Sequence, residues 1–436
     1  MRQYLDAKRQ HRDAIVFFRM GDFYEMFYED ALTASRALDL TLTSRAKDGS
    51  GGDIPMCGIP HHAADTYLAR LVQKGFRVAI CEQVEDPRKA KGLVRREVVR
   101  VVSPGTFTDS SYLEEREPNF LMCLAMLPST ASSDGIPIYG MGLLDLSTGS
   151  FVTAEYHGSR GRQDLADDVA LLRPREVVLP RDNDLQELLP KPSTPAVTPL
   201  DLWAFDEQRA REQLVTHFAT AGLDGFGLRD RPAAISAAGA LIHYLRETQN
   251  GQLSHIRGIA FRETADAMLI DAGTFKHLEV IRSAEGIRAG SLLDQIDNTV
   301  TLMGSRLLRN WLLRPSVSLE RIHDRLDAVE DFAFRSLERG KFREALKSVN
   351  DIERLIARAA LGTAGPRDLV ALQRSLAEIP RIKAILQPLK APLVASLLAE
   401  LDEVPKVRDA IEASLKQEPP ALARDGGVIR TGVDAP

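Results

Sequence analysis

The pattern of hydrophobic and polar positions in the first 110 residues alternates between helical and extended. Helical spacing covers 1–11, 29–38 and 66–74, and Gly75 is well placed to end the third of these segments. Short apolar or β-rich runs at 14–20, 78–81 and 97–102 predict strands. These residues therefore predict a small mixed α/β domain.

A second α/β unit is predicted from about residue 119. Three successive strand-like runs come first, then a helical segment, a further β-rich run and another helix; the ranges are 120–127, 138–146, 150–156, 163–172, 176–179 and 233–248. Asp134-Gly135 and Thr148-Gly149 are turn signals between the strands.

Strand signals fade from about residue 258, and helical spacing replaces them. Three apolar stripes at this spacing are Leu307, Leu308, Trp311 and Leu312; Ile322, Leu326, Val329 and Phe332; and Leu369, Leu372, Leu376 and Ile379. Pro315, Pro366 and Pro380 fall where helices should stop or restart. The last part of the chain is predicted to be helical.

Length and composition limit the class of protein. A chain of 436 residues exceeds what one hydrophobic core usually serves, so two to four domains are expected. Three cysteines, Cys57, Cys81 and Cys123, have no metal-ligand spacing and favour a reduced intracellular compartment. The start lacks a signal-peptide pattern and no run is long enough to span a bilayer, so we expect a cytoplasmic protein.

The net charge of −5 argues against a general polyanion binder, but the charge is unevenly spread. Residues 1–108 hold 17 Lys and Arg against 14 Asp and Glu, which leaves 39 against 47 for the remainder. Six of these basic residues form a local cluster: Arg88, Lys89, Lys91, Arg95, Arg96 and Arg100. Such a cluster is either a solvated face or a track for phosphates.

The most informative segment is 19–30, which places an aromatic ring and a carboxylate two positions apart beside a turn. If the segment is extended, Phe23 and Glu25 emerge on one side and Tyr24 on the other. One reading assigns these aromatic residues to a core, but burying Glu25 unpaired would be costly. The other reading is a surface that stacks on a nucleobase and hydrogen-bonds to its edge. Gly21 and Asp22 would shape the turn.

The segment 17–27 closely resembles the mismatch-reading segment of the MutS family of DNA mismatch-repair sensors. The similarity continues in five further blocks, at 54–62, 78–84, 99–106, 303–315 and 424–429. The resemblance implies a multidomain chain: a mixed α/β mismatch-recognition domain at 1–110, an α/β connector domain similar to ribonuclease H at 118–250, and an incomplete all-α lever domain at 258–436.

The resemblance implies that Phe23 is an aromatic wedge, inserted at a mispaired or looped site of duplex DNA, where it kinks the duplex. A mispaired step is cheaper to unstack than a matched one, so such a wedge turns that difference into binding energy. Glu25 would serve discrimination more than affinity. Weaker candidates for DNA contacts are Met20, Arg45, Arg95, Arg96 and Arg100.

Full-length members of the family are implied to be ATPases that use ATP and Mg²⁺. No Gly-x-x-x-x-Gly-Lys-Ser/Thr pattern occurs in this sequence, since Gly340-Lys341 is followed by Phe342. We therefore expect this chain to lack the ATPase domain, to hold no cofactor and not to be an enzyme. The implied partners are mismatched double-stranded DNA, a MutL-type protein at the connector, and a second copy, bound weakly here. The family's setting is the bacterial cytoplasm and nucleoid, with no membrane partner.

A nuclease and a protein-interaction scaffold are two alternative classes of function. A nuclease would need several converging carboxylates, and Asp145 at a strand end shows no second acid on the neighbouring β-runs, which favours a turn-capping role. The pair His61-His62 could suggest a metal, but no suitably spaced partner accompanies it. A protein-interaction scaffold is the third class.

Overall fold

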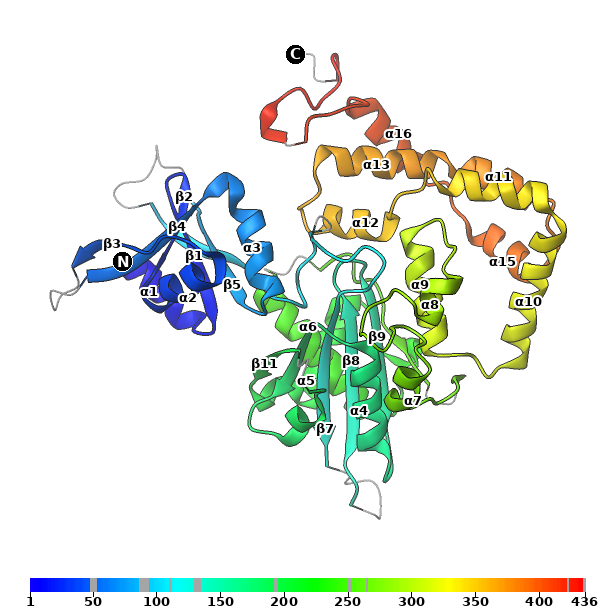
Figure 1. The fold of residues 1–436 in the computed structure, drawn as a ribbon, viewed down its shortest axis with the longest axis horizontal. Coiled ribbons are helices and arrows are strands. Elements are labelled where there is room, and N and C mark those ends of the chain that lie inside the picture. Colours follow the sequence, from blue (N-terminus) through cyan, green and yellow to red (C-terminus); the bar gives the residue numbers. More distant parts are fainter. Residues whose placement is uncertain are drawn as a thin grey trace. The chain divides into compact units, whose positions relative to one another are not determined.

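The computed structural model describes residues 1–47, 53–85, 94–109, 112–128, 135–191, 195–249, 253–263, 266–421 and 423–433. The chain divides into two compact units. The first comprises 1–113, 119–146 and 150–261, and the second comprises 114–118, 147–149 and 262–436. Each unit is built differently, the first around two sheets and the second from helices (Figure 1). Among the described residues, none of the helices has the length and hydropathy needed to cross a membrane.

The first sheet has six strands with β2 and β1 at its centre. Their order is β3 (Thr43–Lys47), β4 (Asp53–Pro60), β2 (Phe23–Phe27), β1 (Ala14–Met20), β5 (Arg77–Gln83) and β6 (Arg96–Val102). Only the β1–β5 pair is parallel; the other neighbours are antiparallel. Three α-helices and a short 3₁₀ helix accompany the sheet: α1 (Arg2–Gln10), α2 (Tyr28–Leu38), α3 (Ala64–Gln73) and η1 (His61–Ala63).

The two faces of this sheet carry separate cores. On one face, Phe17, Met26 and Ile59 pack against residues of α2 and α3. On the other face, Phe18 and its neighbours pack against Tyr4 of α1. Because successive strand residues point to opposite faces, each strand supplies side chains to both cores.

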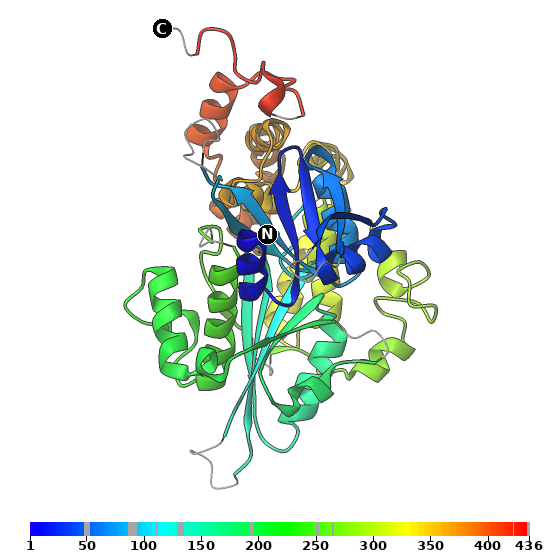
Figure 2. The same cartoon turned by 90° about the vertical axis from the view of Figure 1, so that its left-hand side faces the viewer.

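The second sheet belongs to the same unit and also has six strands (Figure 2). Their order is β11 (Ala196–Leu200), β10 (Glu176–Pro180), β7 (Phe120–Leu127), β8 (Ile138–Asp145), β9 (Ser150–Tyr156) and β12 (Ala260–Phe261). Strands β7, β8 and β9 form an antiparallel meander, whereas β10 and β11 run parallel to β7. The helices in this part are α4 (Gly161–Leu172), α5 (Glu207–Phe218) and α6 (Pro232–Thr248), with 3₁₀ turns η2 (Asp184–Leu188), η3 (Leu202–Phe205) and η4 (Asp224–Phe226).

The second unit is helical, as the spacing predicts. Its helices are α7 (Ala272–His277), α8 (Leu292–Ile296), α9 (Leu302–Leu313), α10 (Leu319–Phe334), α11 (Ser336–Leu346), α12 (Ile352–Ala360), α13 (Pro366–Ala377), α14 (Ile379–Leu386), α15 (Pro392–Glu400) and α16 (Pro405–Ser414), with the 3₁₀ turn η6 (Ala423–Asp425). The stripe on α13 is confirmed in part, because Leu372 and Leu376 are buried, together with Ile379 at the start of α14.

The other two stripes do not form the buried faces that apolar spacing predicts. On α9, Leu307 and Trp311 are exposed, whereas Ser305, Arg306 and Arg309 are buried. None of the residues of α10 is buried. Two residues of its stripe, Val329 and Phe332, line an open apolar groove of about 360 Å³ that is also lined by Trp311. For α9 and α10, helical spacing therefore identified the helices correctly but not a buried side.

Helix α6 approaches the second sheet closely because two glycines of β8 face it. A β-carbon at Gly140 would lie 1.9 Å from the carbonyl oxygen of Ala233, and one at Gly142 would lie 3.1 Å from that of Ala237. Both neighbours are helix backbone, which cannot move aside as a side chain can. Glycine at 140 is thus required for α6 to pack here.

We expect Gly140→Ala to lower the free energy of unfolding by roughly 2–3 kcal/mol, because the helix must retreat from the sheet. Urea denaturation followed by circular dichroism measures the change. Gly225→Ala is the matched control, since a β-carbon there has nothing within 4 Å. Equal stability of the two variants would contradict this packing.

Candidate nucleic-acid interface

The candidate interface lies at the end of the β1–β2 hairpin in the first sheet. A two-residue loop, Gly21-Asp22, connects the strands, and Met20 pairs with Phe23 across it. Gly21 has φ +60°, a conformation that residues with a β-carbon adopt at a cost. The loop is also held from outside: the Arg19 side chain donates to the Gly21 carbonyl (2.5 Å), and the amide of His61 donates to the Asp22 carbonyl (2.8 Å).

Strand β2 separates its side chains as the extended interpretation predicts. Phe23 is 49% exposed, Tyr24 is only 4% exposed, and Met26 is fully buried. Glu25 follows Phe23 on the same face of the strand and is half-buried. The core reading is therefore correct for Tyr24 and Met26 and wrong for Phe23.

The neighbouring strands leave room around these two residues. Phe23 lies opposite Pro60 of β4, and Glu25 lies opposite Gly58, which carries no side chain. On the other edge, Glu25 lies opposite Phe18 of β1. An aromatic ring and a carboxylate are thus displayed side by side on a strand that is hydrogen-bonded at both edges.

The weaker candidates are divided between the two faces of the sheet. Met20, directly opposite Phe23, is half-buried. Arg96 pairs with Gln83, two residues beyond the buried Cys81, so Arg96 shares the face of Phe18 and Phe23. Its guanidinium lies over the Phe18 ring at 5.4 Å and donates to the Arg19 carbonyl (2.6 Å). Arg96 thus already supports the strand that leads into the hairpin.

The remaining basic candidates are less well placed beside Phe23. Arg100 pairs with Ile80, which packs in the core covered by α2 and α3, so Arg100 lies on the opposite face from Phe23. Arg95 is exposed and forms an ion pair with Glu97. Arg45 belongs to β3, but its side chain lies outside the described part of the structure. Arg88, Lys89 and Lys91 also lie outside the described residues.

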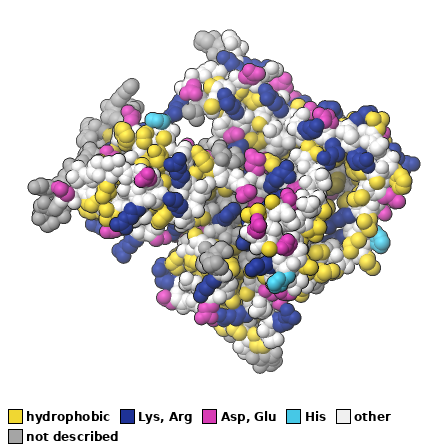
Figure 3. Space-filling model, in the orientation of Figure 1, with side chains coloured by type: hydrophobic (Ala, Val, Ile, Leu, Met, Phe, Trp, Pro, Cys, Tyr) yellow, Lys and Arg dark blue, Asp and Glu magenta, His cyan; other side chains and the backbone are white. Residues whose placement is uncertain are grey.

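The surface of the first domain, at the left of Figure 3, shows hydrophobic and basic side chains next to one another. This mixture suits a duplex, whose bases are apolar on their faces and whose backbone is anionic. It differs from an extended apolar patch, which would favour a protein partner.

The cysteines and histidines do not form a metal site in the described structure. All three cysteines are free and buried. Burial raises the pKa of the Cys57 thiol to about 11 and that of Cys81 to about 12, so both stay protonated near neutral pH. No group of three or more His, Cys, Asp or Glu side chains among the described residues could hold a metal ion.

The acids of the second sheet have structural partners. Asp145 accepts a hydrogen bond from the Asn119 amide (3.1 Å). The sequence interpretation that no other acid lies on neighbouring strands is wrong, because Glu155 is on β9, which pairs with β8. A further acid, Glu176, is on β10, which β7 separates from β8. Glu155 accepts from the amides of Ala233 and Ala234 at the start of α6 (2.8 and 3.1 Å). Glu176 accepts from Gly105, Thr198 and Tyr244. These carboxylates are used separately, so they do not converge as a nuclease requires.

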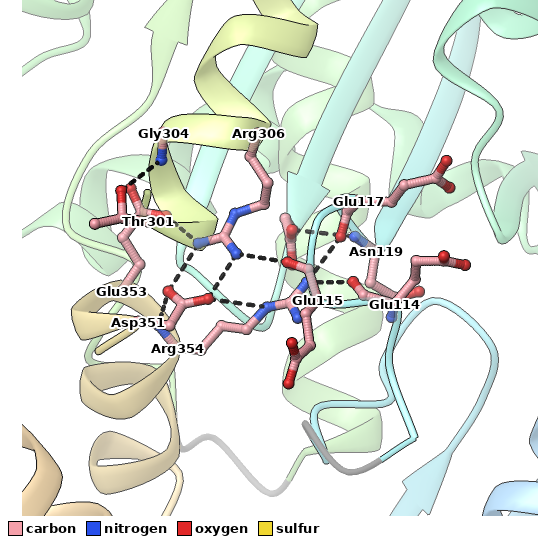
Figure 4. Close-up of polar contacts among 11 residues, drawn as sticks. Glu114, Glu115, Glu117, Asn119, Thr301, Gly304, Arg306, Asp351, Glu353 and Arg354 are labelled. Carbon is pink, nitrogen blue, oxygen red and sulfur yellow. Dashed lines mark hydrogen bonds and ion pairs between the residues drawn. The ribbon is translucent and has the colours of Figure 1, made fainter. Parts of the chain in front are cut away.

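The helical unit contains a cluster of buried arginines that was not predicted from the sequence (Figure 4). Arg306 of α9 donates to both carboxylate oxygens of Asp351 (2.6 and 2.8 Å) and to Glu353 (2.7 Å). Burial opposes its charge, but these hydrogen bonds raise the pKa of Arg306 above its usual range. Arg306 also donates to the Glu115 carbonyl, and Arg354 donates to the carbonyls of Glu114 and Glu117. The segment 114–118 is therefore bound to α9 and α12 through its backbone.

Only their partners distinguish these arginines from solvated ones. The helical pattern places Arg306 and Arg309 between the leucines of α9, where spacing alone predicts solvent exposure. The sequence feature that could have indicated this burial is the pair of acids Asp351 and Glu353 at the start of α12. These acids lie far along the chain from α9.

We expect Gly21→Ala to destabilise the hairpin by roughly 1–2 kcal/mol, because alanine must adopt the positive φ observed at this position. Thermal unfolding measures the effect. Gly222→Ala serves as the control, since its surroundings are open and its φ is not in the positive region. A Gly21→Ala variant as stable as the control would mean that the loop does not need this conformation.

Three domains of one family match the chain in order. The matching family models are MutS domain I at residues 1–111, MutS domain II at 119–257 and MutS domain III at 273–431.

Relatives named DNA mismatch repair protein MutS align along nearly the whole chain. The protein from Pelotomaculum thermopropionicum is 43% identical over 436 residues, covering 99% of this chain and 49% of the relative. The protein from Myxococcus xanthus is 43% identical over 442 residues, covering 100% and 48%, and that from Methanosarcina acetivorans is 40% identical over 457 residues, covering 99% and 49%. The chain spans about half the length of these curated relatives. It belongs to the MutS family of DNA mismatch repair proteins, of which it carries domains I, II and III.

Proposed function

We propose that this chain senses mispaired or looped sites in duplex DNA, with Phe23 as an aromatic wedge. The observation that carries the proposal is the half-exposed Phe23 ring on a strand whose other apolar side chains are buried. A large aromatic side chain with half of its surface exposed can stack on a base. Membership of the MutS family supports the same role.

The physical basis of recognition is the ease with which a base step opens. Inserting a ring into the stack costs unstacking energy, which is smaller at a mispair than at a matched pair. The inserted ring then stacks on a base and kinks the duplex toward the opposite groove. Because β2 is paired on both edges, the strand itself does not yield when Phe23 is pushed against the duplex.

Glu25 is proposed to discriminate between sites. A carboxylate approaching a polyanion is repelled unless it accepts a hydrogen bond from a base edge. A hydrogen-bond donor on a base edge is accessible at a mispair that the wedge has opened. In an intact base pair the same donor is already bonded to the partner base. Glu25 thus penalises matched DNA more than mismatched DNA.

Further contacts to the DNA backbone or groove are assigned to four basic residues, Arg45, Arg95, Arg96 and Arg100, and to Met20. Arg95 is exposed, and Met20 and Arg96 share the face of Phe23. Arg45 and Arg100 remain candidates for backbone contacts away from the wedge. Such contacts position a protein on a duplex without reading its sequence.

The domain limits 1–110, 118–250 and 258–436 are proposed as functional divisions. The first contains the first sheet, the second contains the second sheet except β12, and the third contains β12 and the helices α7 to α16. The meander β7–β8–β9 with β10 and β11 parallel to β7 supports a ribonuclease H-like connector. We also propose that the connector binds a MutL-type protein and that a second copy associates weakly.

Binding of ATP and Mg²⁺ is assigned to the whole family protein and not to the residues seen here. The sequence has no phosphate-binding loop pattern, and the described residues offer no group of three or more potential metal ligands. The proposed setting of this chain is the bacterial cytoplasm, in association with the nucleoid.

We expect Phe23→Ala to abolish the preference for a G·T-mismatched duplex over a paired duplex, with the fold intact. Base–aromatic stacking contributes about 1–3 kcal/mol per base, so the loss is roughly ten- to a hundredfold in mismatch affinity. Competition binding at fixed moderate salt measures it. The control is Leu42→Ala, which removes another exposed apolar side chain from the same domain. A Phe23→Ala variant that discriminates as wild type does would refute the wedge.

Glu25→Ala is expected to keep or raise affinity for paired duplex while reducing the preference for the mismatch, because it removes both the repulsion and the acceptor. The same competition assay separates the two affinities. Glu25→Gln, which keeps a hydrogen-bond acceptor without the charge, should retain more of the preference than Glu25→Ala. Unchanged affinities for both duplexes in Glu25→Ala would remove this residue from the proposed site.

A further inference from the structure

The residue between Phe23 and Glu25 points to the opposite face of the sheet and is enclosed there. The Tyr24 ring lies 5.7 Å from the Phe17 ring and 5.5 Å from the His61 ring. The guanidinium of Arg19 lies over the Tyr24 ring at 5.6 Å. With 4% of its surface exposed, Tyr24 is fixed on the face that is covered by α2 and α3.

The hydroxyl of Tyr24 connects two strands that are not neighbours. It donates a hydrogen bond to Oε1 of Glu82 on β5. In the sheet, β1 lies between β2 and β5, so this bond crosses over β1. Burial, followed by the contact with Glu82, raises the pKa of Tyr24, which keeps the phenol protonated as a donor.

The same carboxylate reaches the other edge of β2. Nε2 of His61 lies 4.0 Å from Oε1 of Glu82. His61 follows β4 directly and begins η1. One carboxylate oxygen therefore approaches β2 through Tyr24 and the end of β4 through His61, although Glu82 itself is on β5.

This bridge lies beneath the end of the hairpin, beside its loop. Phe23 pairs with Met20 across the loop, so its backbone N–H and C=O point toward β1 and not toward Pro60 on β4. Next to that pair, the amide of His61 donates to the Asp22 carbonyl. The end of the hairpin is thus held by this backbone bond, by the Arg19 side chain on the Gly21 carbonyl and by the side chains beneath it.

We propose that Tyr24, Glu82 and His61 are positioning residues that fix the end of β2 relative to β4 and β5, so that Phe23 is presented as a rigid wedge. This inference rests on the proposed function of Phe23. If the strand could move, Phe23 would be displaced whenever the base stack opposes its insertion. The difference in unstacking cost between a mispaired and a matched step would then no longer affect binding. The three residues should therefore control mismatch discrimination while changing affinity for paired duplex little.

The direct test is Tyr24→Phe, which removes one hydroxyl and keeps the ring. Tyr112→Phe is the matched control, because it also removes a hydroxyl, the one that bonds to Thr66 at 2.9 Å, away from the hairpin. Two measurements are made on the whole chain: the ratio of affinities for G·T and paired duplexes, and hydrogen exchange of the amides of residues 22–26 without DNA.

In Tyr24→Phe we expect the affinity ratio to fall roughly three- to tenfold, which corresponds to the net contribution of a typical hydrogen bond. We expect hairpin exchange to be faster than in Tyr112→Phe. Glu82→Ala should lower the ratio at least as much as Tyr24→Phe, because it also removes the contact with His61. The double variant should be no worse than Glu82→Ala alone, because the Tyr24 hydroxyl has already lost its acceptor there. Glu82→Gln should restore much of the ratio, since its amide oxygen can still accept from Tyr24.

The outcomes separate this inference from the proposed function. Unchanged hairpin exchange in Tyr24→Phe would overturn the positioning role. So would an unchanged affinity ratio in Tyr24→Phe if Phe23→Ala has lost the preference. If wild type shows no preference at all, the proposed function fails, and hydrogen exchange alone decides whether the bridge holds the hairpin.

Discussion

The pairing of β2 between β1 and β4 is the constraint on which the candidate interface depends. A strand with two hydrogen-bonded edges cannot rotate, so its alternation assigns each side chain to one face. Phe23 and Glu25 are consequently on the face that stays partly open, and Tyr24 and Met26 enter the core. A shift of one residue in register would bury Phe23 and expose Tyr24, so the two cores of the sheet also protect the position of the wedge.

Local features of this arrangement could be predicted from the sequence because they depend on neighbours along the chain. The alternation of Phe23, Tyr24 and Glu25 and the turn at Gly21-Asp22 follow from spacing and from residue type. The bridge from Tyr24 to Glu82 could not be predicted, because it joins residues 58 positions apart across an intervening strand. The spacing of hydrophobic and polar residues along the chain does not indicate which strands are neighbours in a sheet.

The helical unit shows a second limit of patterning. Apolar spacing on α9 predicts that its leucines pack, yet the buried side of this helix carries Arg306 and Arg309. Burial of a guanidinium is tolerable only when carboxylates and carbonyls replace the lost water, as Asp351 and the backbone of 114–118 do here for Arg306 and Arg354. Since a buried charge without its partner costs several kcal/mol, this cluster favours one arrangement of the segment over others.

The arginines near the hairpin indicate which features provide affinity for DNA and which provide selectivity for a mispair. Arg19 and Arg96 donate to backbone carbonyls beside the turn, and Arg95 is paired with Glu97. Side chains held in this way stabilise the strands and have less freedom to follow a phosphate. On the proposed function, attraction to the DNA phosphates weakens with salt, whereas selectivity comes from a rigid ring and one carboxylate. Discrimination of this kind depends on the stiffness of the hairpin, and it changes with salt much less than affinity does.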